Sequence, residues 1–109
     1  MAESDDNELI KDANLFRNLG HATRLKVLEY LLEGEKNVTE LLGLIEGLQQ
    51  GRLSSHLGWL RMWKYVYSRR VGKNVYYGIS DPRVRKIIEA LSEEKPAGKV
   101  AESSKDENP

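Results

Sequence analysis

One β-hairpin is expected in a chain whose other apolar residues recur at helical spacing. The runs YVYSRR (65–70) and NVYYGI (74–79) are rich in the β-branched and aromatic residues that strands favour, with VGKN forming the turn between them. Apolar periodicity predicts four helices before this hairpin and one after it. The predicted fold class is therefore mainly α with a small β-hairpin, in the order α-α-α-α-β-β-α.

The helices are indicated by apolar stripes and by residues typical of helix ends. The stripes of the first, second and last helices are Leu9, Ile10, Ala13, Phe16 and Leu19, then Leu25, Leu28 and Leu32, then Val84, Ile87, Ile88 and Leu91. Gly47 ends the third helix, and Gln49 or Gln50 opens the fourth. The last helix begins with Asp81 as N-cap and Pro82 at its first position.

A chain of 109 residues has room for one domain with a single core, which we place at residues 8–92. Residues 1–7 and 93–109 lack apolar periodicity and are expected to be disordered tails. No apolar run is long enough to span a membrane, and the acidic start is unlike a signal peptide. Cysteine is absent, which excludes disulfides and thiolate metal ligands. The expected compartment is the cytoplasm.

Charge is distributed unevenly, although the formal net charge is zero. Residues 49–80 hold six basic side chains and no acidic one, in a chain that has 17 acidic residues. Such a block predicts a positive surface for an anionic partner. The alternative is a chance cluster on a solvated face.

Ser54 and His56 lie in this block and raise the question of nucleophilic catalysis. Two residues apart on a helix, their side chains point about 200° away from each other. No carboxylate lies in the block to orient the imidazole, as a catalytic triad would need. We therefore predict that the protein is not an enzyme. We interpret His56 as a partly buried residue hydrogen-bonded to a neighbouring element, with direct contact to DNA as the alternative.

The helix that opens at Gln49 or Gln50 has the pattern of a DNA-reading helix. Leu53, Leu57 and Leu60 share one narrow arc and must face the core. The opposite face is small, polar and basic, with donors suited to phosphates and base edges. The residues expected to read or approach bases are Gln50, Gly51, Arg52, Ser54 and Ser55.

The hairpin that follows carries Arg69, Arg70 and Lys73 around its tip, where they are expected to hold DNA phosphates. Six of the eight aromatic residues also lie in this block. Stacking on nucleobases is one role for them, but packing of a small sheet onto helices is favoured.

The segments LGHATRLKVLEYLLEGEKNVTELL, LQQGRLSSHLGWLR and YSRRVGKNVYYGISDP together resemble the ArsR/SmtB family of winged helix-turn-helix repressors, over about residues 9–91. The resemblance implies a homodimer with a recognition helix in each half-site, a β-wing, and operator binding that represses transcription.

Three positions depart from the family pattern. The helix before the recognition turn has no cysteine, and the last helix has Asp81 but no histidine to complete an acidic-histidine metal site. Lys64 stands where the family often has glycine, so either the lysine is left-handed or the helix ends differently. We therefore expect no cofactor and no metal at the usual family sites, and the effector is unknown.

The terminal helices carry more apolar residues than one small core can bury, which favours an isologous dimer interface. The residues expected there are Leu9, Phe16, Val84, Ile87, Ile88 and Leu91. The leading hypothesis is a homodimeric transcriptional regulator that binds double-stranded DNA and acts as a repressor. The alternative is a winged-helix module that binds another protein through its aromatic face.

Overall fold

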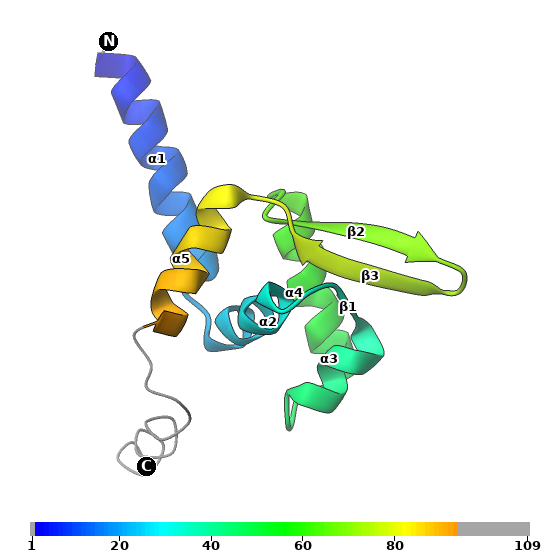
Figure 1. Cartoon of the computed structure of the whole chain (residues 1–109). Helices are drawn as coiled ribbons and strands as arrows, with labels where there is room; N and C mark the ends of the chain where they lie inside the picture. Colours follow the sequence, from blue (N-terminus) through cyan, green and yellow to red (C-terminus); the bar gives the residue numbers. More distant parts are fainter. Residues whose placement is uncertain (1, 94–109) are drawn as a thin grey trace.

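The computed structural model describes residues 2–93, with side chains from residue 7 onward. Within this part of the chain, the helices gather on one side and a small antiparallel sheet projects from them (Figure 1). The elements are α1 (Ala2–Leu19), α2 (Ala22–Leu32), β1 (Lys36–Asn37), α3 (Val38–Leu44), α4 (Gln50–Met62), β2 (Val66–Val71), β3 (Asn74–Ile79) and α5 (Pro82–Glu93). The predicted fold class and the order of its helices and hairpin strands are confirmed.

The two ends of the chain were expected to be disordered tails. Helix α1 begins at Ala2, so residues 2–7 are helical where a tail was expected. The segment has neither glycine nor proline, and its acidic residues are favoured near a helix N-terminus by the helix dipole. At the other end, Glu93 belongs to α5, and residues 94–109 lie outside the described part of the chain.

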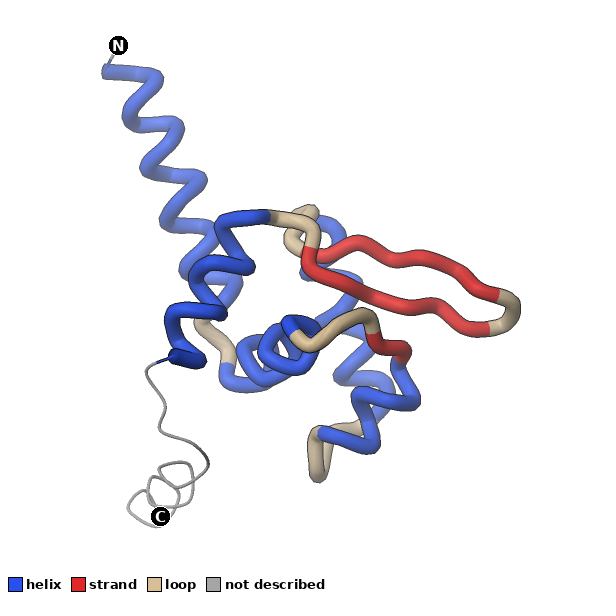
Figure 2. The backbone as a smooth tube through the Cα atoms, in the orientation of Figure 1, coloured by secondary structure: helices blue, strands red, loops and turns tan. Residues whose placement is uncertain are grey.

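The sheet has three strands in the order β1-β3-β2, all antiparallel. The hairpin of β2 and β3 has the expected position, and Arg70 pairs with Val75 near its tip. Figure 2 shows this hairpin extending well beyond the helices. Strand β1 was not predicted, because two residues are too few to show a period-2 pattern; it pairs Lys36 with Tyr77 on β3.

One core joins all five helices to the base of the hairpin. Helix α2 lies at its centre and packs against α5 and β3. The buried side chains of α2 are Val27, Leu28 and Leu31, whereas Leu25 and Leu32 of the expected stripe are only partly covered. The rest of the buried apolar set is Leu15, Leu19, Leu41, Ile45, Leu53, Leu57, Leu60, Tyr65, Val66, Ile79, Val84 and Ile88.

Helix α4 ends at a lysine in the left-handed conformation. Lys64 has φ 66°, and it is the only residue other than glycine with positive φ in the described chain. The amide of Tyr65 donates to the carbonyl of Leu60, and that of Lys64 donates to Arg61, both at 2.9 Å. These two bonds form a Schellman motif, which normally places glycine at this position. Of the two conformations left open for Lys64, the left-handed one is found.

Candidate nucleic-acid interface

Helix α4 separates its core side from its exposed side cleanly. Leu53, Leu57 and Leu60 are completely buried, and they attach the helix to the domain. The residues expected to meet bases, namely Gln50, Gly51, Arg52, Ser54 and Ser55, are all exposed. A β-carbon added at Gly51 or Gly58 would have no neighbouring atom within 4 Å. No side chain therefore keeps another molecule from approaching the backbone at these two positions.

Helices α3 and α4 form the helix-turn-helix pair. Asn37 caps α3 in a reciprocal capping box with Glu40, through bonds of 2.8 and 2.9 Å. The turn after α3 passes through Gly47 at φ 80°, a conformation that suits glycine. These local preferences fix where α4 begins, and hence which of its residues point outward.

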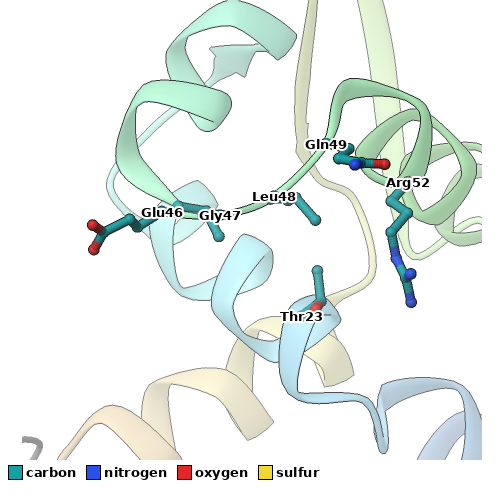
Figure 3. A pocket seen from close by; sticks show the side chains of 7 residues that line it. Thr23, Glu46, Gly47, Leu48, Gln49 and Arg52 are labelled. Carbon is teal, nitrogen blue, oxygen red and sulfur yellow. The ribbon is translucent and has the colours of Figure 1, made fainter.

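A hollow of about 380 Å³ opens beside this turn (Figure 3). Thr23 from the start of α2, Leu48 and Gln49 from the turn, and Arg52 from α4 surround it. Neither α2 nor α4 has a side-chain N-cap bond or an acidic residue in its first turn. The first backbone N–H groups of both helices therefore keep donor capacity for an anion approaching this side.

A second cleft, of about 430 Å³, runs between α4 and the hairpin. Arg61 donates to the hydroxyl of Ser68 at 3.0 Å across it. The cleft is lined by Ser54, Gly58, Arg61, Ser68, Arg70, Val75 and Tyr77. Arg61 and Ser68 were not assigned a site role from the sequence. For Arg61 a signal existed, because it lies seven residues after Ser54 and so shares its flank of the helix.

The three basic residues of the hairpin tip do not share one environment. Arg70 and Lys73 are exposed, and no ion pair involves either of them in the described part of the chain. Arg69 instead forms an ion pair with Glu35, with a closest distance of 2.6 Å. This pairing was not foreseen, because the two residues are 34 positions apart. The charge of Arg69 is thus paired in the described chain, and its expected contact with a phosphate stays a prediction.

Glu35 lies in the segment between α2 and β1. Hydrogen bonds from Arg69 and then from Tyr67 hold the pKa of this carboxyl well below its usual range, at about 2. The carboxylate is therefore ionised at every physiological pH. A fully charged acidic group therefore contacts strand β2.

The interpretation of His56 as a partly buried residue bonded to a neighbouring element is confirmed. Arg24 from α2 donates from Nε to His56 Nδ1 at 3.0 Å, and its Nη1 donates to the carbonyl of Asn18 at 2.9 Å. Partial burial, then the charge of Arg24, lowers the pKa of His56 below its ordinary value. The bond requires neutral imidazole, since the protonated ring has no acceptor.

Three aromatic residues of the block make contacts within the domain. Tyr65 is buried, and its ring stacks on Trp63 at 6.2 Å between centroids. The indole of Trp59 donates to Asn18, while the guanidinium of Arg24 lies 5.7 Å from its ring centroid. These contacts support the packing interpretation for Trp59, Trp63 and Tyr65.

Known proteins share both the sequence and the fold. No protein-family model matches the chain. The transcriptional activator HlyU of Vibrio cholerae is 38% identical over 77 residues, which cover 71% of this chain and 70% of that protein. A probable mercury resistance operon repressor of Streptomyces lividans is 41% identical over 76 residues, 70% of this chain but only 60% of the relative's length. The structure of the transcriptional repressor BigR from Xylella fastidiosa superposes with a TM-score of 0.76 at 33% identity, covering 89% of this chain and 98% of that one.

The chain belongs to the ArsR/SmtB family of winged helix-turn-helix transcriptional regulators. Within this family fold, α3 and α4 are the helix-turn-helix, α4 is the recognition helix, and β2 and β3 are the wing. The similar proteins are transcriptional regulators rather than enzymes. The chain is accordingly a DNA-binding transcriptional regulator by family.

The dimer interface predicted from the sequence is partly wrong on helix α5. Val84 and Ile88 of α5 are 0% exposed, because they face α2 inside the core of the single chain. They are therefore not available to contact a partner. The helix wheel alone did not separate the core-facing side of α5 from its outer side.

Other members of the predicted interface remain accessible. Leu9 and Phe16 on α1 are 64% and 62% exposed, and Leu91 on α5 is 40% exposed, with Ile87 half-buried next to it. Helix α1 extends away from the rest of the domain (Figure 1). Its outer apolar stripe thus has no partner within the described chain.

Among residues 7–93, no three His, Cys, Asp or Glu side chains come together as metal ligands. Within the described chain, no helix is both long and apolar enough to cross a bilayer.

Proposed function

We propose that the protein is a homodimer that binds a specific operator and represses transcription from it. The observation that carries this proposal is the division of α4, which is anchored by three buried leucines and presents a small, polar and basic face outward. That face lies in a 32-residue stretch without a carboxylate. A helix with this profile fits a major groove, where close approach and hydrogen-bond donors are both needed.

The recognition helix reads sequence in this proposal. Arg52 is exposed at its first turn and supplies the planar fork that pairs with guanine. Ser54 and Ser55 add short donors, and Gly51 lets the backbone come near the bases. The proposed base-contacting set is Gln50, Gly51, Arg52, Ser54 and Ser55.

The wing holds the DNA backbone. Arg70 and Lys73 carry charges that no described acidic side chain compensates. Arg61 and Ser68 join Arg70 along the cleft between α4 and the wing, which suits a phosphate strand passing between the two elements. Contacts of this kind supply affinity that depends on salt but carry no sequence information.

Dimerisation would involve the apolar faces of α1 and α5. Leu9, Phe16, Ile87 and Leu91 are the accessible members of the expected interface, and an isologous contact would cover each of them twice. A two-fold dimer presents two recognition helices to two half-sites, so the operator is expected to be palindromic.

The sequence supplies neither of the family's usual metal-ligand sets, so we propose regulation without metal sensing at those positions. As a regulator of transcription it would work in the cytoplasm, beside the chromosome. The competing hypothesis of a protein-binding aromatic face is weakened at Trp59, whose indole N–H is already bonded to Asn18.

Selection of bound duplexes from a random pool, followed by fluorescence anisotropy, tests this proposal. We expect a palindromic consensus that is bound at least about 10³-fold more tightly than random DNA. Binding should weaken steeply as salt is raised. No enrichment and no salt dependence would contradict DNA binding and favour the protein-interaction hypothesis.

A further inference from the structure

Glu35 accepts hydrogen bonds from two side chains of the wing. The hydroxyl of Tyr67 donates to its Oε2 at 2.6 Å, and Nη2 of Arg69 donates to its Oε1 at 2.6 Å. Nε of Arg69 also lies 3.2 and 3.1 Å from the two oxygens. Both carboxylate oxygens thus accept hydrogen bonds from side chains of β2, although Glu35 itself lies in the segment that connects α2 to β1.

This contact spans the whole sheet. The strand order is β1-β3-β2, so Tyr67 and Arg69 must reach across β3 to meet Glu35 beside β1. Their pairing partners on β3 are Gly78 and Tyr76. A β-carbon at Gly78 would collide with the ring of Tyr67, so glycine is what allows the tyrosine to lie across β3.

Strand alternation gives the two faces of β2 different surroundings. Tyr67 and Arg69 share the face that meets Glu35. Ser68 and Arg70 share the other face, which lines the cleft beside α4. The charge of Arg69 is therefore compensated on the side away from the recognition helix, whereas that of Arg70 is available beside it.

We propose that Glu35, Tyr67 and Arg69 form a clamp that sets the angle of the wing relative to the recognition helix, and that Glu35 is a positioning residue for DNA binding. Arg69 acts through Glu35 and is not a phosphate contact. The proposal rests on the DNA binding proposed above, because the clamp matters only if the wing and α4 grip the same duplex.

The physical reason is the weakness of an unsupported hairpin. Two strands alone are marginally stable in water, and this pair extends well beyond the helices (Figure 2). The wing has no acidic residue of its own, so an ion pair that fixes it must recruit an acid from elsewhere in the chain. Glu35 supplies it from a segment held between α2 and the first strand.

A double-mutant cycle tests the clamp by fluorescence anisotropy across a salt series. Glu35→Gln and Arg69→Ala should each weaken binding to the selected duplex by about threefold, the size expected for an exposed ion pair. The double variant should be no weaker than either single variant, because both remove the same contact. The slope of log affinity against log salt should stay that of the unmodified protein.

If Arg69 bound a phosphate, the two single variants would change DNA binding differently. Glu35→Gln would then strengthen DNA binding by freeing a cation, and Arg69→Ala would flatten the salt slope by about one for each subunit. Either result overturns the clamp.

Two further variants test the clamp if the substitutions in the cycle also change the stability of the fold. Exchanging the charges, Glu35→Arg with Arg69→Glu, should restore binding relative to Arg69→Glu alone; failure to restore it contradicts the clamp. Gly78→Ala displaces Tyr67 without altering any charge, and it should weaken binding with an unchanged salt slope.

Arg70→Ala serves as the control for DNA contact by the wing. If it flattens the slope while Glu35 and Arg69 behave additively, the clamp fails and the proposed function stands. If the unmodified protein binds no duplex, both fail.

Discussion

Trp59 on the recognition helix donates its indole N–H to Oδ1 of Asn18, at the end of α1, over 2.8 Å. Asn18 is the one buried polar residue of the described chain, at 6% exposure, and its Nδ2 also donates to the hydroxyl of Tyr65 at 3.4 Å. Helix α1, which belongs to the proposed dimer interface, and the recognition helix are thus joined by a part-buried hydrogen bond.

Trp59→Phe should destabilise the protein by about 1–3 kcal/mol, because it leaves the Asn18 oxygen without its donor in a buried place. Urea unfolding followed by circular dichroism measures the change. Trp63→Phe is the matched control, since Trp63 is about as exposed and makes ring contacts only. Equal losses for the two variants would show that the bond to Asn18 contributes little.

Lys64→Gly should stabilise the protein by about 1 kcal/mol. A lysine at φ 66° is strained at the end of α4, and glycine adopts this conformation without a clash. Lys64→Ala removes the same charge but keeps the β-carbon, so it should leave the unfolding free energy near that of the unmodified protein. A gain in Lys64→Ala as large as that in Lys64→Gly would trace the effect to charge instead.

Acidification should weaken the fold through His56. Its pKa is lowered in the folded protein, so the unfolded chain takes up a proton first as pH falls below 6.5. The stabilising contribution is therefore complete above 6.5 and is lost as pH falls from there to the lowered folded value. His56→Asn keeps an acceptor for Arg24 but does not titrate, so the unfolding free energy of this variant should fall less between pH 7.5 and 5.5. Identical pH profiles would contradict this role for His56.

Phe16→Glu and Leu91→Glu should dissociate the proposed dimer at micromolar concentration and weaken operator binding together. Both side chains are exposed in the single chain, so neither change disturbs the core. Sedimentation velocity measures the association. Leu44→Glu on α3 is the control for adding a charge at an exposed apolar position, and it should leave the protein dimeric. Ile88→Glu should instead unfold the chain, because that residue is completely buried.

Local pattern was sufficient to predict the helices, the hairpin and the outward face of α4. Each depends on contacts within one or two turns of the chain, such as the leucine arc behind Arg52. The partners of Arg69 and Trp59 were not predictable in this way, because Glu35 and Asn18 lie 34 and 41 residues away. The core side of α5 was missed for a similar reason, since α2 decides which of its apolar residues are covered.

The central claim is that α4 reads bases while the wing holds phosphates. Anisotropy with Arg52→Ala and Arg70→Ala, on the selected duplex and on random DNA across a salt series, tests it most directly. Arg52→Ala should cost roughly 1–3 kcal/mol on the selected duplex and much less on random DNA, because a base contact exists only at the right sequence. Arg70→Ala should weaken both duplexes similarly and flatten the salt slope by about one for each subunit. Equal weakening of both duplexes by Arg52→Ala would contradict the reading role of the helix.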